Sequence, residues 1–162
     1  MKKIKLSQNL YAIVDDEDFD KLNLYKWSAT KQHKTYYAIR AFKKTDGVRT
    51  TIRMHRSIMS APETMQVDHL NSNGLDNRKS NLRLCNNAEN NRNRGKYITN
   101  TSGYKGVSWN KQHNKWRSQI FVDYKTVFLG YFQELKDAVQ AYDEGAKKYH
   151  KNYAKLNLKV LK

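Results

Sequence analysis

The stretch from Val67 to Arg94 constrains this chain most, because it carries many polar side chains that a hydrophobic core does not need. A short apolar run ends in the pair Asp68-His69, and a loop rich in Gly and Asn follows. A second short apolar run comes next, and then an Asn-rich segment that is typical of a helix start. This order predicts a strand, a long loop, a second strand and a helix in one compact unit.

The polar groups of this stretch can build a hydrolytic site. A hard divalent cation needs few protein oxygens when water and substrate phosphate supply the rest, and Asp68 and Asn90 offer such oxygens. His69 points to the opposite face if it lies on a strand, and it can take a proton from water. Metal and base together make a minimal phosphodiester hydrolase. The alternative is a loop-rich domain in which Asp68 is a cap and His69 is a surface imidazole.

Three pieces at consistent spacing carry a family resemblance: Asp68-His69, Asn81-Leu82-Arg83 and Asn90. They resemble the HNH endonucleases of the phage and intron-homing type. The resemblance implies a ββα-metal fold, with its core at about 50–95. It implies that His69 is the general base and that Asp68 and Asn90 hold the metal. It further implies that Asn81 braces the loop and helps to orient the histidine.

The resemblance leaves two choices open. The neighbouring Asn91 is a second candidate for the metal ligand assigned to Asn90, and Mg²⁺ or Mn²⁺ would suit oxygen ligands. We expect Mg²⁺. The segment Met54-His55-Arg56 resembles the strand that leads into such units. Cys85 is the single cysteine, which excludes an internal disulfide and a cysteine-cluster zinc site, so we expect no structural zinc.

The charge of the chain points to a polyanionic partner. It has 162 residues, with 31 Lys and Arg against 15 Asp and Glu, which gives a formal net charge of +16. We expect duplex DNA, although an acidic membrane surface or no specific polyanion is the alternative. No apolar run is long enough for a membrane span, and the N-terminus lacks a signal-peptide core. We therefore expect a monomer without membrane or protein partners in the cytoplasm of a bacterial or phage-infected cell.

The N-terminal region reads mainly as strands. The acidic cluster Asp15–Asp18 precedes apolar residues at helical spacing, which predicts a capped helix start, with a metal site as the alternative. Strands are expected around residues 11–14, 36–39 and 51–54. We expect the basic side chains of this region to contact phosphates. We place one domain at 1–95, a basic linker at 96–102 and a second domain at 103–162.

The C-terminal region predicts three strands followed by one helix. The strands are expected at 104–109, 116–122 and 126–132. Their alternation puts Arg117 and Gln119 on one face, and it puts Val127, Leu129 and Tyr131 opposite Thr126 and Phe128. A helix follows, with one apolar face formed by Leu135, Ala138, Val139, Tyr142, Ala146 and Tyr149.

Residues 103–157 resemble the plant Apetala/ethylene-response-factor DNA-binding domain. The matching pieces are Tyr-Lys-Gly-Val at 104–107, Lys115-Trp116, Leu-Gly-Tyr-Phe at 129–132, Ala138 through Asp143, and Ala-Lys-Leu-Asn at 154–157. That family inserts its sheet into the DNA major groove. The resemblance and the basic linker together imply these DNA-binding residues: Lys105, Ser108, Lys111, Arg117, Gln119, Thr126, Phe128, Arg92, Arg94 and Lys96.

These features predict an α+β chain with a small β-rich N-terminal region, a ββα-metal nuclease unit, and a three-stranded antiparallel sheet backed by one helix. The expected function is a metal-dependent DNA endonuclease that its C-terminal sheet directs to duplex DNA. Phage and bacterial mobile-element proteins pair the same two modules. The first alternative is a DNA-binding regulator that keeps an HNH-like fold without cutting. The second is an RNA-binding or RNA-cleaving protein.

Overall fold

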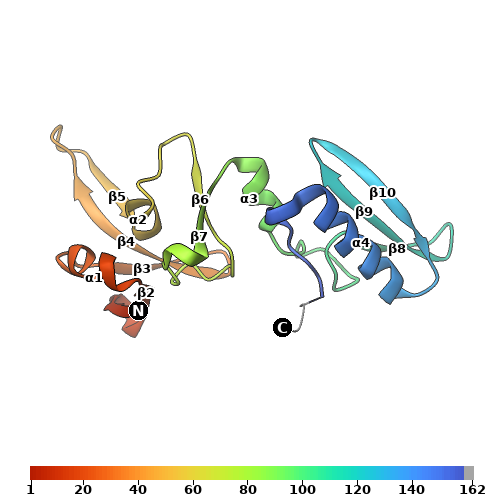
Figure 1. The fold of residues 1–162 in the computed structure, drawn as a ribbon, viewed down its shortest axis with the longest axis horizontal. Helices are drawn as coiled ribbons and strands as arrows, with labels where there is room; N and C mark the ends of the chain where they lie inside the picture. Colours follow the sequence, from red (N-terminus) through yellow and green to blue (C-terminus); the bar gives the residue numbers. More distant parts are fainter. Residues whose placement is uncertain (159–162) are drawn as a thin grey trace. The chain divides into compact units, whose positions relative to one another are not determined.

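A computed structural model describes residues 1–158, so the last four residues of the predicted C-terminal domain, 159–162, lie outside the described residues. The chain divides into two compact units, Met1–Asn87 and Ala88–Lys162, and Figure 1 shows the fold of each. Four α-helices and several small antiparallel sheets are present among the described residues. The predicted mixture of helix and sheet is confirmed.

Unit 1 contains most of the strands. Its elements are β1 (Lys2–Lys5), β2 (Tyr11–Val14), α1 (Asp16–Asn23), β3 (Ser28–Gln32), β4 (Thr35–Lys43), β5 (Arg49–Arg53), α2 (Met54–Ile58), β6 (Gln66–His69) and β7 (Leu82–Cys85). They form three antiparallel sheets, which are β1-β2, β3-β4-β5 and β6-β7. A common core joins the first two sheets to α1 and α2, and it contains Ile4, Leu6, Ala12, Val14, Leu22, Trp27, Ala29, Ala38 and Met54.

The acidic cluster begins α1, as its sequence predicts. Carboxylates are favourable at a helix N-terminus because they oppose the helix dipole. Here they also meet cations, since the Nζ of Lys79 lies 2.5 Å from Glu17 and 3.4 Å from Asp18. The amino terminus lies 2.9 Å from Asp16. These ion pairs tie the helix to distant parts of unit 1.

The expectation of a strand at Met54-His55-Arg56 is wrong, because these residues begin α2. Met54 is fully buried in the core. The guanidinium of Arg56 donates to three carbonyl oxygens after the helix, those of Ala61, Pro62 and Met65, at 2.7 to 3.1 Å. Arg56 is therefore occupied in closing the turn that leads into β6.

Unit 2 is a three-stranded antiparallel sheet with one long helix. Its elements are α3 (Asn87–Asn93), which begins at the boundary, β8 (Val107–Asn110), β9 (Lys115–Val122), β10 (Lys125–Phe132) and α4 (Leu135–His150). The sheet order is β10-β9-β8, and α4 packs on one face (Figure 1). The core contains Val107, Ile120, Ala138, Val139, Tyr142 and Ala146. The predicted apolar face of the helix is the face that packs.

Gly106 permits the close packing of unit 2. Its φ of +74° suits glycine, and a Cβ atom there would lie 2.1 Å from the ring of Tyr142. Residues 88–102 also belong to this unit, although the sequence predicts a boundary at 96–102. The side-chain amide of Asn100 donates to the carbonyl of Tyr104 at 2.8 Å, which helps to fasten the segment. Among residues 1–158, no helix is long and apolar enough to cross a membrane.

Candidate active site

The β6-β7 ribbon places Asp68 and His69 on opposite faces. Successive side chains of a strand alternate between faces, and residues directly opposite in an antiparallel pair share a face. The register pairs Asp68 with Arg83 and His69 with Leu82. The side chain of His69 consequently points toward the interior of unit 1, where β4 and α2 supply its neighbours.

The imidazole of His69 is enclosed by two other rings and one amide. Its ring centroid lies 5.0 Å from that of His55 and 5.8 Å from that of Tyr37, both in edge-to-face geometry. Its Nε2 atom lies 3.3 Å from Oδ1 of Asn77, a fully buried residue. An amide oxygen only accepts hydrogen bonds, so this contact favours the tautomer with its proton on Nε2. The basic lone pair is then on Nδ1.

Burial keeps both histidines neutral near pH 7. It lowers the pKa of His69, while the hydrogen bond with Asn77 and the charges of Asp68 and Asp76 partly oppose that shift. It lowers the pKa of His55 to about 3, and the nearby His69 and two arginines add to the effect. Neutral imidazole is the form that accepts a proton, so His69 is in the state that a general base requires.

Asn81 ties together the two ends of the loop that joins β6 to β7. Its amide oxygen accepts from the backbone N–H of Asn71 at 3.0 Å. Its Nδ2 atom donates to Oδ1 of Asn71 at 3.1 Å and to the carbonyl of Asp76 at 2.7 Å. The same loop carries Asn77, so these bonds also limit the movement of the amide that contacts His69.

The N-terminal sheets also form hydrogen bonds with the loop between β6 and β7. The backbone of Ile13 in β2 donates to Leu75 and accepts from Asn77, both at 2.8 Å. The N–H of Gly74 donates to the hydroxyl of Thr35 at 2.9 Å. A Cβ atom at Gly74 would lie 2.4 Å from a carbonyl of β4, so only glycine allows this approach. The β-rich region therefore acts as a scaffold for the histidine loop.

Asp68 is paired with a cation on the other face of the ribbon. The Nη2 atom of Arg83 lies 2.6 Å from Oδ2 of Asp68, and its Nε atom lies 2.9 Å from the same oxygen. A carboxylate oxygen such as that of Asp68 suits a hard divalent cation, so its chemistry fits Mg²⁺. The second predicted ligand, Asn90, carries an amide oxygen of the same class and belongs to unit 2. Asn90 is half-buried in α3 and Asn91 is exposed.

Lys105, which the sequence predicts as a DNA-binding residue, is partly buried inside unit 2. Its Nζ atom donates to the carbonyls of Arg92 and Arg94, at 2.6 Å each. Burial, with help from the charge of Lys155, lowers the pKa of Lys105 to about 8. This ammonium group caps the C-terminal end of α3. Arg92 is likewise paired, since its Nη2 atom lies 2.9 Å from Asp123.

The predicted strand contacts of unit 2 share the sheet face that α4 does not cover. The register pairs Ser108 with Arg117, Gln119 with Phe128, and Phe121 with Thr126. A β-bulge between Phe128 and Gly130 shifts the alternation of β10, so Tyr131 pairs with Arg117. The prediction that Tyr131 shares a face with Val127 and Leu129, opposite Phe128, is therefore wrong. Three other predicted residues, Arg94, Lys96 and Lys111, are exposed outside the strands.

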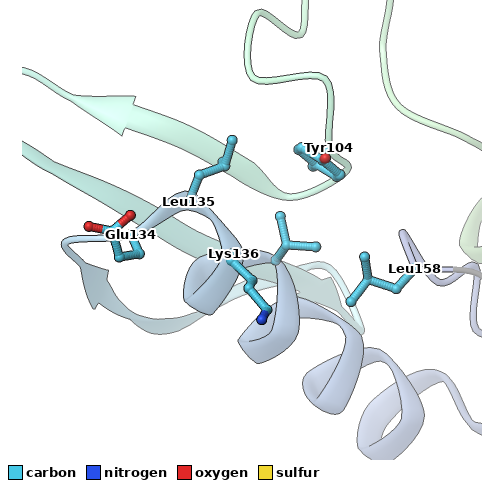
Figure 2. Close-up of a pocket in the computed structure, with 6 residues that line it drawn as sticks. Tyr104, Glu134, Leu135, Lys136 and Leu158 are labelled. Atoms are coloured by element: carbon cyan, nitrogen blue, oxygen red, sulfur yellow. The ribbon is translucent and has the colours of Figure 1, made fainter.

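A small pocket lies elsewhere in unit 2, at the start of α4. Figure 2 shows Tyr104, Leu135 and Leu158 around it, with Glu134 and Lys136 at the first turn of the helix. Most of its lining is apolar, and none of the predicted site residues lines it.

Sequence reasoning missed four residues that surround the candidate base and metal ligand: Tyr37, His55, Asn77 and Arg83. Tyr37 and His55 are distant in sequence and meet His69 only through the tertiary fold. Arg83 could have been found from the strand pairing, because a two-stranded ribbon with Asp68 opposite Arg83 puts opposite charges side by side.

Comparisons with known proteins address the central part of the chain. Residues 60–92 match the family model of the HNH endonucleases, which is about a fifth of the chain. Protein 3.8 of Escherichia phage T7 is 38% identical over 64 residues, which are 40% of this chain and 53% of that protein. The chain thus spans about half the length of this curated relative. No solved structure matches the chain significantly. The central segment is therefore similar to HNH endonucleases, and this similarity indicates nuclease or DNA-binding activity.

Proposed function

We propose that this chain is a metal-dependent endonuclease that hydrolyses phosphodiester bonds in duplex DNA. The observation that carries the proposal is the buried, neutral imidazole of His69, which Asn77 orients and which directly follows Asp68. The match of residues 60–92 to HNH endonucleases supports the same chemistry. The net charge of +16 supports a polyanionic substrate.

In the proposed reaction, His69 takes a proton from a water molecule whose oxygen attacks the scissile phosphorus. The bond from phosphorus to the 3′ oxygen breaks, and that oxygen takes up a proton from solvent. The products are a 5′-phosphate and a 3′-hydroxyl end. The substrate phosphate would lie where β6 ends, because Asp68 and His69 are the last two residues of that strand.

Asp68 and the side-chain oxygen of Asn90 are the residues that would hold the cation, with Mg²⁺ expected and Mn²⁺ also suitable. When bound, the cation neutralises charge on the phosphate and on the leaving oxygen. Among residues 1–158, no three His, Cys, Asp or Glu side chains gather as a metal site. Water and the substrate phosphate would therefore complete the ligand set.

We further propose that the free face of the β8-β10 sheet binds the DNA major groove. Polar and aromatic side chains pair across this face, and residues 90–122 contain no Asp or Glu, which supports this assignment. Replacing Arg117 by Ala should weaken DNA binding about tenfold or more and leave the cleavage rate at saturating DNA unchanged. Lys136→Ala, on the exposed side of α4, is the matched control. Equal effects of both variants on the affinity would contradict the assignment.

A regulator that binds DNA without cutting is the second candidate, and the ion pair of Asp68 with Arg83 favours it. Incubation of supercoiled plasmid and of genomic DNA with Mg²⁺, Mn²⁺ or EDTA separates the two. Nicked or linear products that appear only with metal support the nuclease. Equal gel shifts in all three conditions, with no cleavage of either DNA, support the regulator.

A further inference from the structure

Arg83 holds the carboxylate that the proposed function assigns to the metal. Two of its nitrogens donate to one oxygen of Asp68, at 2.6 and 2.9 Å. Only 8% of the Asp68 side chain and 16% of the Arg83 side chain are exposed. The two residues are also directly opposite in the β6-β7 register. The distances between the paired atoms are short, the pair is shielded from solvent, and the strand register holds the two side chains on the same face.

A guanidinium in this place competes with a metal ion for the same carboxylate. Two positive groups repel strongly at short range where solvent is excluded, so a metal ion can use that oxygen only after Arg83 has moved. A partly buried guanidinium that is released from this carboxylate can bind another anion in its place. Phosphate is such an anion, because the planar fork of arginine matches its oxygens.

The neighbouring ion pair of Arg78 with Asp76 has a structural role that differs from the role of the Asp68–Arg83 pair. Arg78 donates to both oxygens of Asp76 at 2.7 Å, and Asp76 also accepts from Asn71 at 2.9 Å. This pair closes the loop between β6 and β7. The pair of Asp68 and Arg83 lies instead within a strand ladder that backbone pairing already holds.

We propose that Arg83 blocks cation binding at Asp68 in the free protein and transfers to a DNA phosphate when substrate binds, so that metal and DNA load together. The inference rests on the proposed function, since it takes Asp68 as the metal ligand. It requires positive coupling, in which DNA raises the affinity for the cation and the cation raises the affinity for DNA by the same factor.

The test uses the full chain with His69→Ala as the background, so that DNA stays intact. Electron paramagnetic resonance measures Mn²⁺ binding to the free protein. Fluorescence anisotropy measures the binding of a labelled random-sequence duplex with and without Mn²⁺. Arg83→Gln should bind Mn²⁺ about tenfold more tightly without DNA, and the gain in DNA affinity that Mn²⁺ gives the parent should fall by a similar factor.

Two variants locate the effect. Arg78→Gln breaks the matched pair at Asp76 and should leave Mn²⁺ binding unchanged. Adding Asp68→Asn to Arg83→Gln should abolish the gained Mn²⁺ affinity. Arg83→Lys is the fallback if Arg83→Gln fails to fold, because a lysine keeps the charge but loses the two-nitrogen contact. This variant should show an intermediate Mn²⁺ affinity.

The outcomes are separable from those of the proposed function. A folded Arg83→Gln or Arg83→Lys protein with the parent's Mn²⁺ affinity would overturn the inference, and so would an equal gain in Arg78→Gln. These titrations need no cleavage, so they decide on Arg83 even if the chain never cuts DNA. If the protein cuts DNA but Arg83→Gln leaves the Mn²⁺ affinity unchanged, the proposed nuclease activity stands and the proposed role of Arg83 is wrong.

Discussion

His55 and His69 show how single residues set the chemistry of the candidate site. Each ring is almost fully buried, with 3% and 4% of its surface exposed, and the two rings contact each other edge to face. Burial disfavours the charged form of an imidazole, so it lowers the pKa of His55 to about 3 and lowers the pKa of His69 as well. The neutral rings can accept a proton at neutral pH, but the folded chain loses stability in acid because the unfolded chain binds protons that the folded chain does not.

That loss of stability gives a prediction about pH. The pKa of His55 is about 3 in the folded chain against an ordinary value of 6.5. Between these values the unfolded chain binds a proton that the folded chain does not, so the free energy of unfolding falls as pH falls. We expect a loss of up to about 1.4 kcal/mol per pH unit from this residue. Thermal unfolding at several pH values should show it.

His55→Phe separates this effect from general acid denaturation. Phenylalanine keeps an aromatic ring beside His69 and cannot bind a proton, so the variant should lose less stability between neutral and mildly acidic pH than the parent does. If both proteins show the same pH dependence, His55 is not the source of the acid sensitivity.

At the scale of elements, the helix α3 depends on a residue distant from it in sequence. Lys105 donates to its last carbonyls, where a positive charge also opposes the negative end of the helix dipole. The residue precedes β8, so the capping contact ties α3 to the start of the sheet. The resemblance to the Apetala/ethylene-response-factor domain places Lys105 among the DNA contacts, and nothing local to it in the sequence indicates that it caps a helix.

Lys105→Met should loosen the end of α3 without changing the sheet. Loss of two hydrogen bonds from a charged donor should cost about 1 to 3 kcal/mol in the local stability of the helix. Hydrogen exchange at the amides of residues 90–94 should then be faster, while the amides of β9 keep their protection. Lys111→Met, in the exposed turn between β8 and β9, is the control. Unchanged exchange in Lys105→Met would rule out the capping role.

At the scale of the whole molecule, the sequence predicts the local segments better than the tertiary contacts between them. The Asp-His motif at 68–69 identifies the segment that matches HNH endonucleases, because its polar residues are close in sequence. The period-two pattern of residues 116–122 predicts the faces of β9, because strand alternation is local. The resemblance of residues 103–157 to the Apetala/ethylene-response-factor domain remains a prediction, since the family match ends at Arg92.

The misses share a physical cause, which is that tertiary contacts override local pattern. Met54 enters the core and Arg56 binds three carbonyls, so a segment that resembles a strand forms α2. A single bulge moves Tyr131 to the other face of β10. The partners of His69 come from β4, α2 and a loop, and no spacing in the sequence connects them.

The central claim is that His69 is the base of a metal-dependent nuclease, and one measurement tests it most directly. The rate of nicking of supercoiled plasmid with Mg²⁺ should be compared between the parent and His69→Ala, with His33→Asn, in an exposed turn, as the matched histidine control. We predict that His69→Ala lowers the rate by about a hundredfold or more and leaves DNA affinity nearly intact, while His33→Asn cuts like the parent. Cutting by His69→Ala at the parent's rate would contradict the claim.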